Sequence, residues 1–213
     1  MQANPAVLKR GLSRARHFYV QRISGFAAPS SPFLEQQGIE WLRSRLASAG
    51  LLLEFGSGGS TLLANQMKVR SVSVESDPFY ADAVRRVLPN PHLATVVTPP
   101  MGLTVEWGMP LIGRRRKGLR YVTAPFENQP GTPDLVLVDG RYRVACALES
   151  ARRLNAVKAR ATLFFDDYGD RPSYQLVEEF LGIPDMVGRA AIFEVGSSSV
   201  PEKAVRALAE DPR

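Results

Sequence analysis

Three acidic side chains follow two apolar runs of the sequence, at places where carboxylates could act as a general base or hold a metal ion. Asp139 comes directly after the apolar run 135–138, and Asp166 and Asp167 come directly after the run 162–165. If the two runs are neighbouring parallel strands, their carboxyl ends meet at one edge of a sheet and bring the three acids together. Two interpretations stay open. The acids could bind Mg²⁺ or another hard divalent ion, or Asp139 alone could be a general base while Asp166 and Asp167 form a helix-capping and loop pair.

A glycine-rich turn predicts a ligand site at the same edge. The segment 56–61, Gly-Ser-Gly-Gly-Ser-Thr, follows the apolar run 51–55 and precedes a helical pattern. Glycines let the backbone approach a ligand closely, and a helix N-terminus offers free N–H groups. Glu75 ends the next strand, 19 residues after Gly56, and an acid at about that distance can accept hydrogen bonds from both hydroxyls of a ribose. These residues predict an adenosine-containing ligand; the alternative is a plain tight turn with Glu54 and Glu75 as solvated strand ends.

Details of the turn narrow the class of ligand. Thr61 stands where the dinucleotide-binding pattern needs its third glycine, and the Gly-Lys-Ser/Thr of a phosphate-binding loop is absent. Glu54 places a negative charge where it would suit a cationic ligand end and repel a pyrophosphate. An acid-x-Gly-x-Gly turn with a second acid after the next strand resembles the S-adenosylmethionine site of class I methyltransferases, with Ser60 in place of the third glycine of that family.

This resemblance implies roles for the matching residues. Gly56 and Gly58 would pack under the methionine part of the cofactor. Glu54 would help to hold the amino group of the cofactor, directly or through water, and Glu75 would hold the ribose. The residues expected at the cofactor are Glu54, Gly56, Ser57, Gly58, Gly59, Ser60, Thr61, Glu75 and Ser76.

The three acids carry a second resemblance, to the O-methyltransferases of the catechol and caffeoyl-coenzyme A type. In that family an acid after the fourth strand and an acid-plus-amide pair after the fifth hold a metal; Asp139, Asp166 and Asp167 match these positions, with Asp167 in place of the amide. Where that family has a catalytic lysine this chain has Tyr142, and Arg141 precedes it. An arginine is a poor base but can bind an anionic group. A closer overall resemblance is to small bacterial methyltransferase-like proteins that carry a Glu-Phe-Gly-Ser-Gly-Gly-Ser-Thr turn and a Val-Asp-Gly-Arg-Tyr/Phe-Arg segment.

Short apolar runs alternate with amphipathic stretches, and this alternation predicts the elements that position these residues. It is typical of an α/β protein with a central, mostly parallel sheet and helices on both faces, here the Rossmann-like fold of class I methyltransferases. We expect residues 1–32 to form a basic arm and residues 33–213 a single domain with an insertion at 99–133. The expected strands are 51–55, 71–75, 93–98, 134–138, 161–165 and an antiparallel edge strand 190–195; the expected helices are 33–48, 60–67, 77–88, 142–154 and 173–181.

The charge of the chain is concentrated in two places. The formal net charge is +6 and the sequence pI is about 9.8. Five basic residues and no acid precede Glu35, and five more basic residues lie between Arg114 and Arg120, so the remainder of the chain carries −4. The second run could be a lid or anion clamp near the cofactor, an RNA-binding surface, or a solvated loop. His17 and His92 are isolated and are expected at the surface.

Composition excludes several classes of protein. A single cysteine, Cys146, cannot form an intrachain disulfide, and no apolar run reaches the length of a membrane-spanning helix. Without a signal-peptide pattern, a cytoplasmic protein is expected.

The expected function is transfer of a methyl group from S-adenosylmethionine to an oxygen of a small, anionic molecule. Asp139 is the expected catalytic carboxylate and Arg141 the expected substrate anchor. Two alternatives stay open: an RNA methyltransferase that uses the run from Arg114 to Arg120 on phosphates, and a non-catalytic protein that only binds S-adenosylmethionine. A homodimer is also an open alternative.

Overall fold

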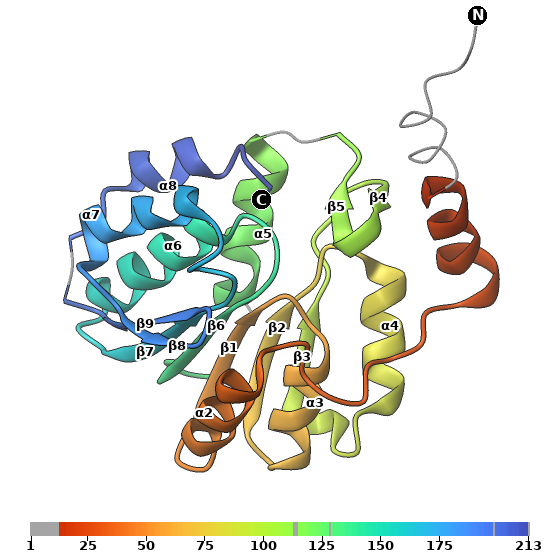
Figure 1. Cartoon of the computed structure of the whole chain (residues 1–213), viewed down its shortest axis with the longest axis horizontal. Coiled ribbons are helices and arrows are strands. Elements are labelled where there is room, and N and C mark those ends of the chain that lie inside the picture. Colours follow the sequence, from red (N-terminus) through yellow and green to blue (C-terminus); the bar gives the residue numbers. More distant parts are fainter. Residues whose placement is uncertain (1–12, 113–114, 128, 198, 213) are drawn as a thin grey trace, which may run out of the picture.

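A single seven-stranded sheet forms the centre of the molecule. The computed structural model describes residues 13–112, 115–127, 129–197 and 199–212, and the sheet has the strand order β3-β2-β1-β6-β7-β9-β8 (Figure 1). The five neighbouring strands β3, β2, β1, β6 and β7 are parallel to one another. The strand β9 is antiparallel to β7, and β8 is antiparallel to β9. The strands are β1 (Leu51–Phe55), β2 (Arg70–Val74), β3 (Ala94–Val97), β6 (Leu135–Val138), β7 (Ala161–Phe165), β8 (Asp185–Val187) and β9 (Ala190–Val195).

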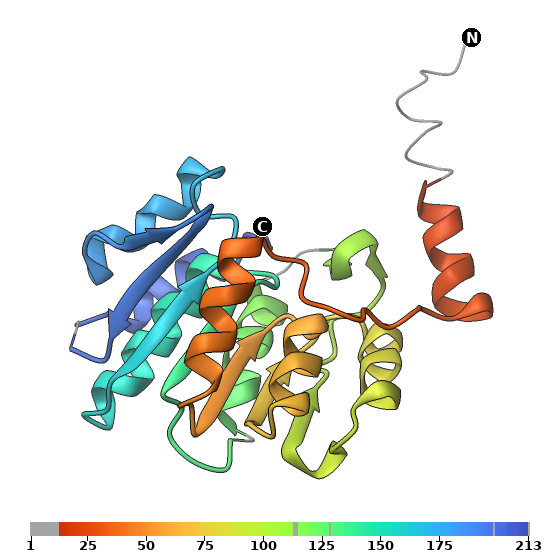
Figure 2. The same ribbon diagram turned by 60° about the horizontal axis from the view of Figure 1, so that its bottom comes forward.

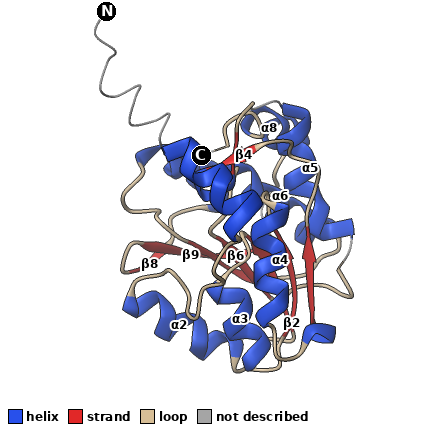
Figure 3. Cartoon of the chain, turned by 90° about the vertical axis from the view of Figure 1, so that its right-hand side faces the viewer, coloured by secondary structure: helices blue, strands red, loops and turns tan. Residues whose placement is uncertain are grey.

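Helices cover both faces of the sheet. In Figure 3, α2 and α3 lie on one side of the strands and α6 and α8 on the other, and Figure 2 shows the first group from the front. The helices and 3-10 segments are α2 (Gln36–Leu46), α3 (Gly59–Gln66), α4 (Pro78–Val87), η2 (Pro91–Leu93), α5 (Arg115–Glu127), α6 (Arg143–Ala156), η4 (Pro172–Val177), α7 (Glu178–Leu181) and α8 (Glu202–Leu208). The predicted Rossmann-like, mostly parallel architecture is therefore confirmed.

The side chains of the central strands explain why helices cover both faces. All residues of β1 and β6 are buried, as expected for parallel strands without a solvent-facing side. Leu52 packs with α2 and α3, whereas Leu53 packs with α5 and α6. Phe55 lies opposite Val138 in the register of these two strands. The two turns that follow β1 and β6 consequently meet at one edge of the sheet.

Several elements differ from the sequence prediction. The strand β9 is not at the edge of the sheet, because the short strand β8 pairs with its outer side. The predicted helix 173–181 is divided into the 3-10 segment η4 and the single turn α7. The helix α8 was not predicted, although its Val205 and the following Ala209 belong to the hydrophobic core.

The insertion 99–133 also differs from its expected loop character. It contains a two-stranded antiparallel hairpin, β4 (Thr104–Val105) and β5 (Met109–Pro110), joined by the 3-10 turn η3 (Glu106–Gly108). It then forms α5, whose Tyr121 and Val122 are buried against the sheet. The insertion therefore contributes Met101, Tyr121, Val122 and Ala124 to the hydrophobic core.

Part of the N-terminal arm is helical and lies against the domain. Residues 13–19 form a helix that continues into a π-helical turn, η1 (Val20–Ser24). This helix, red in Figure 1, lies beside α4. Lys9 and Arg10 of the basic arm lie outside the described residues. In the described part of the chain, no helix combines the length and apolarity needed to cross a membrane.

Candidate active site

A cavity of about 780 Å³ opens at the carboxyl ends of the parallel strands. This edge is where open α/β sheets bind ligands, and the volume lies in the range of small-molecule sites. Seven of the nine predicted cofactor residues line it: Gly56, Ser57, Gly58, Gly59, Ser60, Glu75 and Ser76. Both predicted catalytic residues, Asp139 and Arg141, line the same cavity.

The glycines of the turn after β1 serve different contacts. Gly56 has φ +97, and a Cβ at this position would lie 2.8 Å from the Cα of Gly140 in the turn after β6. A Cβ on Gly59 would overlap the carbonyl of Ser31 in the N-terminal arm. At Gly58 a Cβ would meet only the hydroxyl of Tyr80, at 3.4 Å, and a ring carbon of Pro29, at 3.8 Å. Two of the glycines therefore make room for neighbouring backbone, and Gly58 leaves the most space toward the cavity.

Glu54 lies behind the turn and not in the wall of the cavity. Its side chain is fully buried, and its carboxylate accepts hydrogen bonds from the hydroxyls of Ser60, Thr61 (2.5 Å) and Ser73 (2.6 Å). Burial raises the pKa of Glu54 and the three hydroxyls oppose that effect. The sequence allowed a direct contact between Glu54 and a ligand. In the structure Glu54 instead holds Ser60 in position, and Ser60 lines the cavity. Thr61 likewise points inward, where its hydroxyl accepts a hydrogen bond from the Gly58 N–H at 2.9 Å.

Glu75 is presented at the cavity by the turn after β2. One carboxylate oxygen accepts hydrogen bonds from the N–H groups of Ser76 (2.7 Å) and Asp77 (3.0 Å), and the other from the N–H and hydroxyl of Ser57, both at 3.3 Å. Burial raises the pKa of Glu75. The long contacts to Ser57 leave that oxygen able to accept a hydrogen bond from a ligand hydroxyl. The alternative in which Glu54 and Glu75 are solvated strand ends is wrong, because both are buried.

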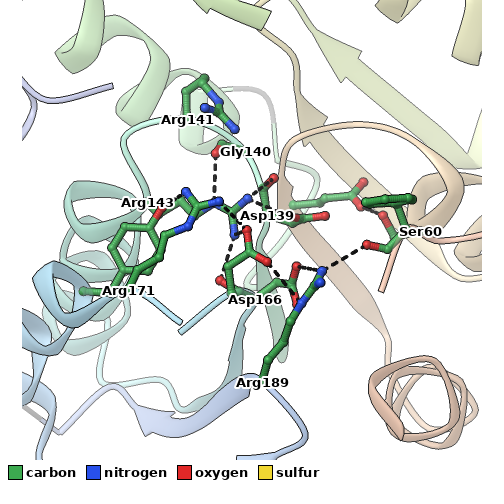
Figure 4. A network of polar contacts seen from close by, with 12 residues as sticks. Ser60, Asp139, Gly140, Arg141, Arg143, Asp166, Arg171 and Arg189 are labelled. Atoms are coloured by element: carbon green, nitrogen blue, oxygen red, sulfur yellow. Dashed lines mark hydrogen bonds and ion pairs between the residues drawn. The ribbon is translucent and has the colours of Figure 1, made fainter. Parts of the chain in front are cut away.

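The three predicted carboxylates do come together, but arginines pair with all of them. Figure 4 shows Asp139 and Asp166 among these arginines. Arg189 contacts Asp166 at 2.7 Å and Asp167 at 3.1 Å, and Arg171 contacts Asp167 at 2.8 Å. Among the described residues, no group of three His, Cys, Asp or Glu side chains is arranged to hold a metal ion. The predicted metal site at Asp139, Asp166 and Asp167 is therefore corrected: guanidinium groups occupy the positions around these oxygens where a divalent cation would have to bind.

Arg143 is the centre of this network, and the sequence prediction missed it. Its side chain is 4% exposed and contacts Asp139 at 2.9 Å and Asp167 at 3.3 Å. It also donates to the backbone carbonyls of Gly140 (3.1 Å) and Asp166 (2.7 Å). Arg143 thereby joins the ends of β6 and β7. No helical spacing marked the Asp139–Arg143 pair, because Asp139 follows β6 and α6 begins only at Arg143.

Asp139 has the electrostatic properties of a general base. Burial raises its pKa to about 7; the neighbouring Arg143 opposes this effect, while Asp166 and Asp167 add to it. The backbone N–H of Asp139 donates to the carbonyl of Phe55 at 2.9 Å, so the residue lies directly beside the glycine turn.

Arg141 differs from the other arginines of the cavity because it lies apart from the network (Figure 4). Among the described residues, none accepts a hydrogen bond from its Nε atom, which is buried. Burial and the charge of Arg143 lower the pKa of Arg141. Its backbone N–H donates to the hydroxyl of Tyr121 at 3.3 Å. The described wall at this end therefore holds one more arginine than carboxylates, and Arg141 is the one without a carboxylate partner.

Sequence reasoning also missed a wall of the cavity that comes from the N-terminal arm and the β4–β5 hairpin. The arm contributes His17, Phe26, Pro29 and Phe33, and the hairpin contributes Glu106, Trp107, Gly108 and Met109. The expectation that His17 lies at the surface is wrong, because its side chain is 8% exposed. No pattern marked these residues, since their spacing along the chain matches no ligand-binding motif.

The described residues of the basic run do not form a clamp at the cavity, which was one of the three interpretations of this run. Its described members Arg115, Arg116, Lys117 and Arg120 lie on or at the start of α5, and none of them lines the cavity. Arg115 pairs with Glu210 near the C-terminus. Arg114 lies outside the described residues. Within the insertion, the hairpin and Tyr121 supply the cavity wall instead.

Comparison with known proteins agrees with this fold. No protein-family model and no curated protein matches the chain. A solved structure of a methyltransferase-like protein from Silicibacter pomeroyi is 33% identical, covers 87% of this chain and 99% of its own, and has a TM-score of 0.76. A candidate O-methyltransferase from Klebsiella pneumoniae shares the fold, with a TM-score of 0.52 at 14% identity over 94% of this chain and 91% of its own. The Silicibacter pomeroyi protein is this similar over nearly its whole length, and the glycine turn and Glu75 lie at the same edge of the sheet. The chain therefore belongs to the class I S-adenosylmethionine-dependent methyltransferase family.

Proposed function

We propose that this enzyme transfers a methyl group from S-adenosylmethionine to a hydroxyl oxygen of a small, negatively charged molecule, with Asp139 as general base. The observation that carries the proposal is the placement of Asp139: it lines the cavity beside the glycine turn, and burial raises its pKa to about 7. A carboxylate with a pKa near the working pH is suited to accept a proton and to release it again.

The described residues fit the proposed cofactor. The Glu75 oxygen that has only the long contacts to Ser57 can accept a hydrogen bond from a ribose hydroxyl. Ser60 donates its proton to Glu54, so its lone pairs face outward as acceptors for an ammonium group. Gly58, where a Cβ would meet only Tyr80 and Pro29 at ordinary contact distances, suits close approach of the methionine part. When bound, the cofactor supplies an electrophilic methyl group on a positively charged sulfur.

Asp139 removes the proton that the acceptor hydroxyl loses as its oxygen gains the methyl group. Arg143 holds the Asp139 carboxylate in position, with a contact of 2.9 Å. Because Arg143 is nearly fully buried and bonded on several sides, this orientation is fixed before a substrate binds. The proton can then pass to solvent, since the Asp139 side chain is 26% exposed.

Arg141 supports a negatively charged acceptor. The other three cavity arginines pair with carboxylates, whereas the Arg141 Nε has no acceptor in the described part of the chain. Leaving the buried Nε of Arg141 without an acceptor is costly, and a ligand carboxylate or phosphate would relieve that cost. The RNA alternative receives no such support, because the described residues of its basic run do not line the cavity.

We expect the rate to rise with pH through about 7 and to level off above it, because only deprotonated Asp139 can accept a proton. The measurement is release of S-adenosylhomocysteine against pH at saturating cofactor, with hydroxylated carboxylates and phosphates as acceptors and their neutral analogues as controls. A rate that is independent of pH between 5 and 9 contradicts the assignment of Asp139 as base. Addition of excess chelator serves as the control for metal dependence and should leave the rate unchanged.

We expect Arg141→Gln to raise KM for an anionic acceptor about 10- to 100-fold, because a charge-assisted hydrogen bond contributes about 1.5–3 kcal/mol. The KM for S-adenosylmethionine should change little. The exposed Arg86→Gln in α4 is the matched control for loss of one charge. Equal effects of Arg141→Gln on an anionic acceptor and on its neutral amide contradict a charge-based role.

A further inference from the structure

One segment of the chain crosses the rim of the cavity from outside the sheet. Residues 13–33, which we call the N-terminal segment, supply four residues of the cavity wall and lie far from its other residues in the sequence. The carbonyl of Ser31 packs directly on Gly59 at the start of α3. The ring of Phe26 packs edge-on against Tyr80 of α4, with 5.5 Å between ring centroids. The N-terminal segment is thus fitted to both helices that follow the cofactor-binding turns.

Gln21 fastens this segment to two parts of the site at once. It is 4% exposed, and its Nε2 donates to Asp77 at 2.7 Å and to the hydroxyl of Thr104 at 2.9 Å. Thr104 also donates to the same Asp77 oxygen at 3.0 Å. Asp77 follows Glu75 and Ser76 and caps α4, with its other oxygen accepting from the N–H of Phe79 at 2.9 Å. Gln21 therefore joins the N-terminal segment to the turn after β2, which presents Glu75, and to the β4–β5 hairpin.

The hairpin and the N-terminal segment meet again at the mouth of the cavity. Phe33 ends the segment and Trp107 is at the tip of the hairpin; their ring centroids are 5.9 Å apart, and they are 77% and 76% exposed. Trp107 has φ +60, a left-handed conformation that is unfavourable for a bulky residue. The carbonyl of Phe33 accepts a hydrogen bond from Arg189 at 3.4 Å, which ties this point to the carboxylate network. Two exposed aromatic rings are thus held at the cavity, one by each segment.

We propose that the N-terminal segment is part of the cofactor site and that Gln21 is a positioning residue that keeps the cofactor enclosed. Through Asp77 and Thr104, Gln21 holds the segment and the hairpin against the turn that presents Glu75. Without the hydrogen bonds of Gln21 to Asp77 and Thr104, the N-terminal segment and the hairpin separate at the mouth of the cavity, and the cofactor dissociates faster. The proposed catalytic residues Asp139 and Arg141 lie in the turn after β6 and contact neither Gln21 nor Thr104, so the rate at saturating cofactor remains close to that of the parent. This inference rests on the cofactor site of the proposed function.

The experiment uses Trp107 as its reporter. The chain contains two tryptophans, Trp41 and Trp107, so Trp41→Phe leaves the hairpin residue as the single fluorophore. In this background, stopped-flow fluorescence with S-adenosylhomocysteine gives the association and dissociation rates for Gln21→Ala and Thr104→Val. Tyr19→Ala, a residue 56% exposed on the same helix, is the matched control. Trypsin cleavage after Arg22, with and without S-adenosylhomocysteine, reports directly on the N-terminal segment.

We expect Gln21→Ala to raise the dissociation rate about tenfold, because it removes two buried hydrogen bonds, and Thr104→Val to raise it less. S-adenosylhomocysteine should protect the bond after Arg22 in the parent and in Tyr19→Ala, but not in Gln21→Ala. KM for the cofactor should rise while kcat stays within about threefold. The inference is overturned if Gln21→Ala and Thr104→Val release the ligand at the parent rate, whether or not their melting temperatures fall. Failure of the Trp41→Phe parent to bind S-adenosylhomocysteine would instead contradict the proposed function.

Discussion

Asp139→Asn should lower kcat about 10²- to 10⁴-fold, the range that a positioned general base contributes. The amide keeps the size of the side chain but cannot accept the proton of the acceptor hydroxyl. Because Asp139 lies at the end of β6, apart from Glu75 after β2, the affinity for S-adenosylhomocysteine should stay within a few fold. Calorimetric titration and steady-state kinetics on the same preparation separate the two quantities.

The matched control for Asp139→Asn is Asp167→Asn. Asp167 lines the same cavity and contacts Arg143, Arg171 and Arg189, so its substitution changes the local charge equally without removing the proposed base. The pH dependence near 7 should persist in Asp167→Asn and disappear in Asp139→Asn. A similar loss of kcat in both variants would mean that the charge of the network matters and not a base at position 139.

Arg143→Met should give the largest loss of stability. The substitution removes the arginine partner of Asp139 and one of the three arginine partners of Asp167, and breaking a buried pair costs about 3–5 kcal/mol. For a chain of this size a melting temperature falls by roughly 2–4 °C per kcal/mol, so the expected decrease is about 10 °C. Differential scanning calorimetry measures it.

The sign of the pH effect gives a second readout for Arg143→Met. Arg143 lowers the pKa of Asp139 against the larger effect of burial, so its removal should move the pH dependence of the rate to higher pH. Arg171→Met is the control, because its side chain is 41% exposed and it contacts only Asp167 among the three carboxylates. It should reduce the melting temperature by no more than a few degrees. Equal decreases in both variants would contradict a central role for Arg143.

The parallel part of the fold followed from the sequence because its signals are local. The buried strands β1 and β6 are continuous apolar runs, and Asp77 with Pro78 marks the start of α4, where Asp77 accepts hydrogen bonds from two backbone N–H groups. The glycine turn required no tertiary information either, because Gly56 needs its positive φ to leave the strand. The meeting of the strand ends at one edge then follows from parallel pairing, whereas the strand order came from the tertiary structure.

The sequence did not predict the helix α5, because its composition disfavours a helix and only tertiary packing stabilises it. It contains Gly118 and Pro125, which weaken an isolated helix. Position 118 requires a glycine because a Cβ there would overlap the carbonyl of Ala209, the residue that follows α8. Such a contact between residues distant in the sequence leaves no local pattern, so the region resembled a loop.

The sequence by itself determined which residues lie at the edge of the sheet where the cavity opens. Each of them follows a strand that can be predicted from an apolar run of the sequence: the glycine turn, Glu75, Asp139, Asp166 and Arg141. Only the tertiary structure decided what these residues contact. Among the described residues, Arg143, Arg171 and Arg189 pair with the three carboxylates, and a segment predicted to be a basic arm lines the cavity. The physical reason is that burial and charge pairing depend on distances in space. A strand end fixes the position of a carboxylate, while the partner that comes from another element decides whether it binds a metal, accepts a proton or forms an ion pair.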